Sequence, residues 1–311
     1  MHRRIILLMV VLLVTLGASA QYDPSFSHYW AMETSFNPAA AGKEKVINLT
    51  GAYAMTLLGF EHAPKTMYVS GDMPFEAIGM YHGVGAQIMN DEIGVFSHKR
   101  IALQYAAKIP LFGGVLSIGA QGGILSENLD GSKLDLEDPT DPAFSSSEVT
   151  GTGIDVGAGI YYARKNWYVG ISALHLTAPL IEIGEKNELQ VDRTYYLTGG
   201  YNIRLRNPFF TIHPSMLART DGSAWRVDVG ARVKYSYEKR VFYAGAAYSP
   251  QNSVTVLLGG VFQGISLGYS YEFYTNGISL GNGSHELCVG YQMEMDFGKK
   301  GRNRHQSVRL L

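Results

Sequence analysis

Two runs near the end of the chain alternate between apolar and polar residues. In residues 265–273 every second residue is apolar, and small or charged residues lie between them. Residues 287–297 repeat this pattern, with large apolar side chains on one face and glycine, cysteine, glutamine or acids on the other. A period of two is that of an extended strand. Each run is about ten residues long, the length that a tilted strand needs to cross a bilayer, so the pattern predicts the wall of a membrane barrel.

The same alternation, interrupted by turn residues, predicts about fourteen antiparallel strands along the rest of the chain. The clearest further example begins at Trp225, where apolar residues alternate with Arg226, Asp228 and Arg232. The runs 99–109 and 114–125 alternate less clearly, so twelve or sixteen strands also fit. The predicted strands lie at about 46–57, 65–74, 82–90, 99–109, 114–125, 153–163, 167–176, 193–206, 208–219, 224–234, 241–249, 253–262, 264–273 and 285–297.

The connections between these strands are long at one end of the predicted barrel and short at the other. Short periplasmic turns and longer outer loops are the known asymmetry of outer-membrane barrels. The sequence therefore predicts an all-β, transmembrane, antiparallel outer-membrane β-barrel over residues 46–298, with both termini in the periplasm. The outward-facing connections are expected at about 58–64, 91–98, 126–152, 177–192, 220–223, 250–252 and 274–284, and they include every long one; the opposite connections, such as 111–113, 164–166 and 262–264, are tight.

A water-soluble sandwich is the rival fold, because it also has regular short strands. Composition favours the barrel: the chain has 36 glycines and 20 tyrosines, and only 17% of its residues are charged. Glycine weakens the strands of soluble proteins, whereas in a barrel it leaves room in the interior. Tyrosine is enriched at the two membrane interfaces.

The first twenty residues have the features of a cleaved signal peptide. Residues 2–4 are basic, residues 5–16 are apolar, and Ala18-Ser19-Ala20 is a small-x-small cleavage site. Cleavage is expected between Ala20 and Gln21. About twelve apolar residues are too few to span a bilayer as a helix. An exported chain with many amphipathic strands belongs in the outer membrane of a Gram-negative bacterium.

Residues 21–45 do not alternate, but they are rich in aromatic side chains. These are Tyr22, Phe26, Tyr29, Trp30 and Phe36. The segment is interpreted as a plug inside the barrel or as a periplasmic arm that binds a partner. A poorly ordered leader is the alternative, which the density of aromatic residues disfavours.

The chain ends in a basic tail, residues 299–311, which the barrel prediction places in the periplasm. Its positive charges include Lys299, Lys300, Arg302 and Arg304. The tail either binds an acidic surface of a periplasmic partner or stays solvated.

Composition and motifs exclude several other function classes. A formal net charge of −1 argues against nucleic-acid binding. The single cysteine, Cys288, excludes an internal disulfide and a multi-cysteine metal site. Neither a Gly-x-Ser-x-Gly elbow nor a phosphate-binding loop before a helix is present. We expect no enzyme activity, no cofactor and no metal.

Two groups of polar residues are candidate sites. The acidic connection 126–152 contains carboxylates that suit calcium, but their spacing is not that of an EF-hand, and Pro139 and Pro142 account for a rigid turn. A solvated loop is the preferred interpretation. Those carboxylates are Asp135, Glu137, Asp138 and Asp141. At the last strand, Ser284 and Glu286 are expected to satisfy loop backbone groups where Gly283 makes the turn.

Several motifs, taken in order, resemble the PorP/SprF family of outer-membrane proteins from the type IX secretion system of Bacteroidetes. The resemblance covers nearly all of the mature chain. Departures are Glu272, where aspartate is usual, Ala40, where an aromatic residue is usual, and the basic tail. The positions that match the family are Asn37, Pro38, Gly42, Pro64, Asp138, Pro139, Asp141, Pro142, Pro214, Gly268, Tyr269, Tyr271, Gly283, Ser284, His285 and Glu286.

This resemblance implies a non-enzymatic barrel that takes part in protein export or gliding. Its expected partners are the periplasmic ring and lipoprotein components of the secretion system, secreted cargo or adhesins, and outer-membrane lipid. The alternative is a channel for small or hydrophobic solutes, with a lumen free of the N-terminal segment. An outer-membrane hydrolase would need a clustered nucleophile and base, which the sequence does not show.

Overall fold

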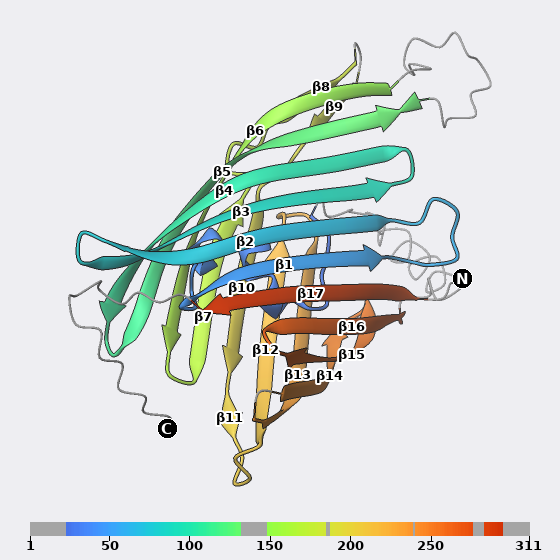
Figure 1. The fold of residues 1–311 in the computed structure, drawn as a ribbon. Helices are drawn as coiled ribbons and strands as arrows, with labels where there is room; N and C mark the ends of the chain where they lie inside the picture. The colour runs from blue at the N-terminus through green and yellow to red at the C-terminus, as the bar shows by residue number, and fades with distance from the viewer. Residues whose placement is uncertain (1–22, 132–147, 185–186, 239, 276–282, 295–311) are drawn as a thin grey trace, which may run out of the picture.

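The computed structural model describes residues 23–131, 148–184, 187–238, 240–275 and 283–294, and it shows a closed antiparallel β-barrel (Figure 1). Fourteen strands form the wall, as the alternation predicted. β1 pairs with β17 from Val46↔Glu294 to Met55↔His285, so the sheet has no free edge. The wall strands are β1 (Val46–Met55), β2 (Lys65–Ala77), β3 (Met80–Ile93), β4 (Phe96–Leu111), β5 (Gly114–Asp130), β6 (Glu148–Arg164), β7 (Trp167–Leu174), β10 (Thr194–Tyr201), β12 (Phe210–Thr220), β13 (Trp225–Tyr237), β14 (Arg240–Ser249), β15 (Ser253–Phe262), β16 (Ile265–Tyr274) and β17 (Ser284–Glu294).

The two faces of the wall have the polarity that a membrane requires. On β15 and β16 the large apolar side chains point outward: Leu258 is 59% exposed and Leu267 is 55% exposed. The alternate positions point into the barrel, where Ser270 is 1% exposed. A soluble sandwich buries its apolar faces, so this distribution excludes that fold.

The connections differ at the two ends of the barrel. At one end, named the turn end here, hairpins close with two residues, as at 78–79, 112–113, 165–166 and 263–264. Phe112 and Gly113 both have positive φ, 47° and 73°, which is the backbone of a tight hairpin turn. The opposite end, the loop end, carries the connections 56–64 and 175–193. The strand ends at Val46 and Glu294 therefore share the turn end.

Two of the predicted loops at the loop end are wrong in their bounds. The predicted loop 91–98 is only residues 94–95, because β3 and β4 stay paired up to Ile93↔Phe96. The predicted loop 126–152 starts and ends with strand, because β5 and β6 pair up to Asp130↔Glu148. These strands continue past the apolar belt, where the hydrophobic alternation stops but hydrogen-bonded pairing does not.

Two further differences lie between β7 and β12. The predicted strand 193–206 is interrupted at Asn202, whose N–H bonds to the Asn166 carbonyl (2.7 Å), so a short β11 (Ile203–Arg204) follows. The predicted loop 177–192 contains the hairpin β8 (Leu180–Ile183) and β9 (Asn187–Gln190), at the top of Figure 1. Ile181 of this hairpin packs in an apolar cluster with Leu125 of β5.

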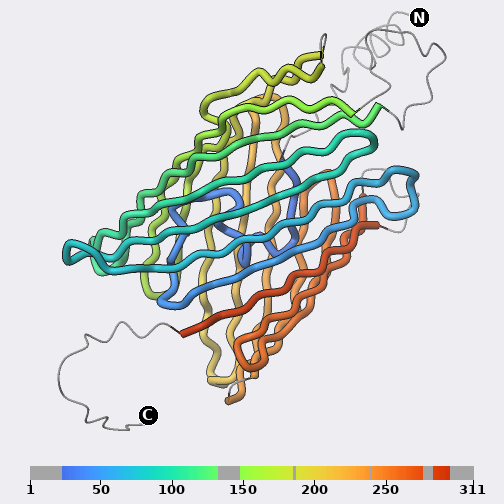
Figure 2. The backbone as a smooth tube through the Cα atoms, turned by 45° about the horizontal axis from the view of Figure 1, so that its top comes forward, coloured from blue at the N-terminus to red at the C-terminus, as the bar shows by residue number. Residues whose placement is uncertain are grey.

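Residues 23–42 lie inside the ring of strands (Figure 2). They form three short 3₁₀ turns, η1 (Tyr29–Ala31), η2 (Glu33–Ser35) and η3 (Pro38–Ala40). Met32, Asn37 and Ala39 are fully buried there. No helix among the described residues has the length and apolar character to cross a membrane.

Candidate functional site

The candidate site is the interior of the barrel, which residues 23–42 fill; this segment is called the plug below. The plug runs from the loop end to the turn end. Its first residue, Asp23, contacts His175, which follows β7 at the loop end. Near its other end, the Gly42 N–H donates to Asp72 of β2 (2.7 Å), and the chain then enters β1 at Val46. The first residue of β1 and the last described residue of β17 lie at the turn end, whereas Asp23 lies towards the loop end; the two chain termini lie outside the described residues.

Asp23 holds the first part of the plug by charge. Its buried carboxylate pairs with Arg100 of β4 (3.0 Å) and with Nε2 of His175 (3.2 Å), and it accepts a hydrogen bond from Tyr196 of β10 (2.5 Å). Burial alone raises the pKa of this carboxyl, but His175 and Arg100 outweigh it and hold the pKa well below its usual range. The carboxylate is therefore ionised and compensated.

His175 links the plug to a second carboxylate. Its Nδ1 lies 3.0 Å from Asp155 of β6, and both side chains are fully buried. Burial by itself lowers the pKa of the imidazole, yet Asp23 and Asp155 together raise it to about 9. From β12, which pairs with β10, Arg219 donates to the Asp23 and Pro24 carbonyls (2.7 and 2.9 Å). Charged side chains from β4, β6 and β12, and from the connection after β7, thus meet at the start of the plug.

Glu286 of β17 holds the next turn of the plug. Its carboxylate accepts hydrogen bonds from the N–H groups of Ser27 (2.6 Å) and His28 (3.0 Å), and it lies 2.6 Å from Nδ1 of His28. The sequence predicted that Ser284 and Glu286 would satisfy loop backbone. Ser284 does so, accepting from Leu57 N–H (2.9 Å), but Glu286 serves the plug instead.

The motif Asn37 to Gly42 packs against bare backbone of the wall. Asn37 caps η3 by accepting from Ala39 N–H (2.9 Å) and donates to the Ile160 carbonyl of β6 (3.2 Å). Three inward glycines face this stretch, and we call them the glycine strip. A Cβ on each would collide with the plug: Gly83 of β3 with Ala41 O (2.0 Å), Gly119 of β5 with Ala39 N (2.4 Å) and Gly159 of β6 with Asn37 Oδ1 (2.1 Å). Only glycine fits at these three positions, because the backbone of the plug or the Asn37 side chain lies directly against them.

The aromatic residues of the plug contact the wall. Phe26 lies against Tyr68 (ring centroids 5.6 Å apart), and Phe36 stacks on Tyr196 (5.5 Å). The hydroxyl groups of Tyr29 and Ser215 are 2.8 Å apart. These rings are buried, so the contact that they make in this structure is with the barrel itself. Tyr22, Ala20, Gln21, Lys299, Lys300, Arg302 and Arg304 lie outside the described residues.

The remaining family positions have mainly local roles. Gly268 of β16 leaves space for His28 and Tyr243, whose nearest atoms would lie 2.7 and 2.4 Å from a Cβ. His285 points away from the lumen, with its Nδ1 2.7 Å from the Tyr269 hydroxyl and its ring against Tyr271. The carbonyl groups of Pro64 and Gly283 accept hydrogen bonds from the N–H groups of Thr56 (2.9 Å) and Leu58 (2.8 Å), respectively. Pro214 of β12 lies opposite Ala231 of β13 in the strand register. Asp138, Pro139, Asp141 and Pro142 lie outside the described residues.

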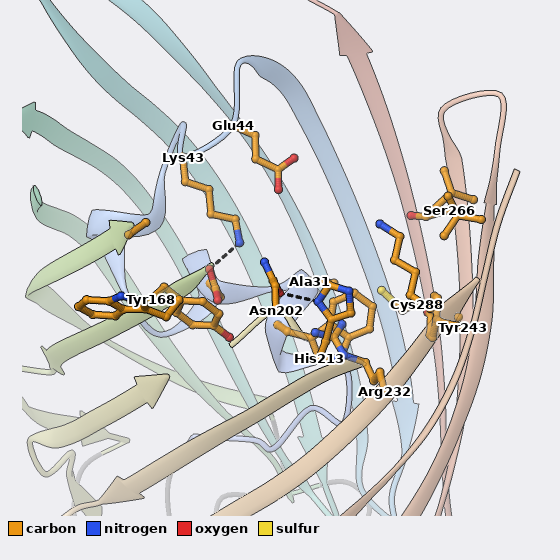
Figure 3. A pocket seen from close by; sticks show the side chains of 18 of the residues that line it. Ala31, Lys43, Glu44, Tyr168, Asn202, His213, Arg232, Tyr243, Ser266 and Cys288 are labelled. Carbon is orange, nitrogen blue, oxygen red and sulfur yellow. Dashed lines mark hydrogen bonds and ion pairs between the residues drawn. The ribbon is translucent and has the colours of Figure 1, made fainter. Parts of the chain in front are cut away.

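A cavity of about 440 Å³ lies between the plug and the turn end; we call it the vestibule (Figure 3). The plug contributes Trp30 to it, and the ion pair of Glu33 with Lys43 (2.6 Å) lies at its edge. A second cavity of about 190 Å³ adjoins it and shares Trp30 and Cys288. On the other side of the plug, beside Asp23, a cavity of about 20 Å³ shares no lining residue with the vestibule.

Part of this site is visible in the sequence. Arg232 lies at a polar position of the alternation along residues 225–233, so the pattern predicts that it faces inward. The contacts of the site join residues far apart in the chain, such as Asp23 and His175, which are separated by 152 residues, so the pattern does not predict them. Within the described residues, no group of three His, Cys, Asp or Glu side chains is placed to hold a metal ion.

The family described as type IX secretion system membrane protein PorP/SprF matches residues 18–291, most of the 311-residue chain. The chain belongs to this family. The resemblance inferred from the ordered motifs is thereby confirmed. PorP/SprF membership makes the protein a component of a secretion system, and the barrel is how it spans the membrane. No curated protein matches the chain.

Solved structures with this fold are outer-membrane barrels. The CymD monoaromatic hydrocarbon channel is 13% identical, with a TM-score of 0.51 over 90% of this chain and 95% of that chain. A FadL homologue of Pseudomonas aeruginosa is 14% identical (TM-score 0.49, 89% and 95% covered). Omp33 of Acinetobacter baumannii is 9% identical (TM-score 0.44, 82% and 100% covered). At such identities, the likeness to CymD shows the barrel fold and not an activity.

Proposed function

We propose that this protein is a non-enzymatic barrel of the outer membrane that docks the periplasmic ring and lipoprotein components of the type IX secretion system. From that position it anchors secreted surface proteins or helps their export. The turn end faces the periplasm in this proposal, because short turns are on that side in outer-membrane barrels. β17 ends at Glu294 at the same end, and residues 299–311, which come after it in the sequence, are rich in positive charge.

The observation that carries the proposal is the fixed plug. It is bonded to seven strands of the wall, so the lumen is built to stay filled rather than to conduct. The bonds come from Asp72 (β2), Arg100 and Gln104 (β4), Ile160 (β6), Ser172 (β7), Tyr196 (β10), Ser215 and Arg219 (β12) and Glu286 (β17). A passive channel needs a lumen that solutes can cross.

Two exposed apolar residues at the turn end support docking on that side. Ile78 is 97% exposed and Phe112 is 82% exposed, at the tips of the hairpins β2–β3 and β4–β5, which are neighbours through the pairing of β3 with β4. Both have positive φ, 51° and 47°. A left-handed backbone is unfavourable for bulky residues, above all for a β-branched one. Such residues at solvent-exposed tips fit a surface that a partner protein covers.

The test is affinity purification from native outer membranes after mild crosslinking, followed by mass spectrometry. In the variant Ile78→Asn/Phe112→Asn, asparagine tolerates the left-handed backbone, so the turns survive while the apolar tips are lost. We expect this variant to lose the ring and lipoprotein components that the wild type retains. Phe60→Asn, at the loop end, is the matched control and should retain them. Recovery of lipid alone with the wild type, together with steady single-channel currents, would favour the channel instead.

A further inference from the structure

The charges around the vestibule are not balanced. Among its acidic residues, Glu33 is already paired with Lys43, and Glu44 accepts a hydrogen bond from Gln292 (3.0 Å). Three cations also line the cavity: Arg232 and Lys234 of β13, and Lys165 of the β6–β7 turn. Over the described ranges, no carboxylate forms an ion pair with any of these three. The vestibule therefore has a positive wall that this part of the chain does not neutralise.

Arg232 is the most constrained of these cations. Its guanidinium lies 3.6 Å from the centroid of the Trp30 ring, and Tyr243 meets the same ring edge-on at 5.3 Å. This stacking fixes the guanidinium plane in the cavity. In the described structure, the Arg232 Nε and Trp30 Nε1 groups are buried and have no hydrogen-bond partner. Buried N–H donors without acceptors are costly, so an acceptor from outside the chain would satisfy them.

The rest of the vestibule is mainly apolar or aromatic. Trp167, Tyr168, Val241 and Val261 line it (Tyr168 is labelled in Figure 3). Its volume of about 440 Å³ is within the range of small-molecule sites, which combine apolar walls with a few placed polar groups. Cationic donors on one wall and apolar surface on the others suit a molecule with an anionic head and an apolar body.

We propose that the vestibule binds an anionic amphiphile. Its carboxylate or phosphate head lies against the Arg232 guanidinium, with Lys234 and Lys165 nearby, and its apolar body lies along Tyr168, Tyr243 and Val241. The ligand enters from the turn end, where Lys165 is exposed. The basic tail 299–311 is unsuited as the occupant, because positive charges would meet a positive wall. This proposal goes beyond docking and does not depend on any secretion partner.

The test is native mass spectrometry of the full-length protein in a neutral detergent, with four probes that share one alkyl chain. Decanoate and decyl phosphate carry the two candidate heads, while decanol is neutral and decyltrimethylammonium is cationic. We expect one molecule of decanoate or of decyl phosphate to bind per protein. The anion that binds more tightly identifies the preferred head group, carboxylate or phosphate. Decanol and the cation should not be retained. Equal retention of decanol and the anions, or retention of none of the four, would overturn the proposal.

Arg232→Met should weaken anion binding by about tenfold or more, since a hydrogen bond to a charged group is lost. Arg240→Met is the matched control: Arg240 lies at the same end, also over an aromatic ring (Phe262, 5.6 Å), but it does not line the vestibule. It should bind the anion like the wild type. Arg232→Lys should recover part of the binding, because it keeps the charge but not the planar fork.

Thermal melting without ligand separates binding from a structural role. Arg232 has no carboxylate partner in the described structure, and methionine keeps an apolar stem beside Trp30, so Arg232→Met should lower the melting temperature of the ligand-free protein no more than Arg240→Met does. Added decanoate or decyl phosphate should raise the melting temperature of the wild type and of Arg240→Met, but not of Arg232→Met. Anion binding by Arg232→Met equal to that of the wild type would refute the site.

Discussion

Replacing Gly119 with alanine tests whether the glycine strip holds the plug. A Cβ there would lie 2.4 Å from Ala39 N and 2.6 Å from both Ala39 Cα and the Pro38 carbonyl carbon. All three are backbone atoms, so the plug must move by about 1 Å to restore ordinary contact. Forcing a methyl group into a packed interior costs about 1–3 kcal/mol. Gly122, on the same strand, is the control, because a Cβ there meets nothing within 4 Å.

We expect Gly119→Ala to lower the free energy of unfolding by about that amount and to make the plug accessible to protease in the folded barrel. Gly122→Ala should leave stability unchanged or raise it by about 0.4–1 kcal/mol, because alanine reduces the freedom of the unfolded chain. Denaturant unfolding in detergent, limited proteolysis and planar-bilayer recording measure the three consequences. In bilayers, Gly119→Ala should show intermittent currents that Gly122→Ala lacks. If the two variants match in all three assays, the plug is not held by this contact.

Three further predictions concern the charged contacts of the plug. Asp23→Ala removes the carboxylate that pairs with both Arg100 and His175, although His175 keeps its contact with Asp155, and it should cost about 3–5 kcal/mol in denaturant unfolding; a loss below about 1 kcal/mol would show that the pairs contribute little. Stability should also fall as pH rises from about 6.5 to about 9. The pKa of His175 is raised in the folded state, so its contribution is complete below the unfolded value of 6.5 and is lost by about 9. The pKa of Asp23 is lowered in the folded state, so its contribution is present above 3.8 and is lost in acid. Melting curves against pH should show the alkaline loss in the wild type and not in His175→Gln; parallel curves would contradict the assignment. Glu286→Gln removes the negative charge beside His28 but keeps an acceptor oxygen. It should lower the free energy of unfolding by about 1–3 kcal/mol and speed proteolysis of the plug near His28. An unchanged cleavage rate would count against the contact.

The barrel was predictable because each strand lies between two different environments. Along residues 225–233 the positions that face lipid hold apolar side chains and most of those that face the lumen hold polar ones. A local pattern therefore indicates both the strand and its two faces. That pattern ends where the strands leave the apolar belt. The extensions of β5 to Asp130 and of β6 back to Glu148 depend on pairing between chain segments, which a single sequence does not display.

The sequence left open whether residues 21–45 plug the barrel, form a periplasmic arm or are a poorly ordered leader, and it did not predict the contacts of this segment. Asn37 and Gly159 are far apart in the chain, and they meet only because the plug packs against β6. The sequence shows only that both positions hold small or polar residues. His285 and Glu286 show the same limit. They are adjacent in sequence, but successive side chains of a strand point to opposite faces, so Glu286 points into the lumen and His285 points to the outer face.

Site-specific photo-crosslinking tests the central claim most directly. A photoreactive benzoylphenylalanine in place of Phe112 puts the probe at the exposed tip of a turn-end hairpin, and the same residue in place of Phe60 puts it at the loop end. The account predicts that, in intact cells, the probe at 112 captures a periplasmic component of the secretion system and that the probe at 60 does not. Capture of that component at 60, or of lipid alone at 112, would contradict docking through the turn end.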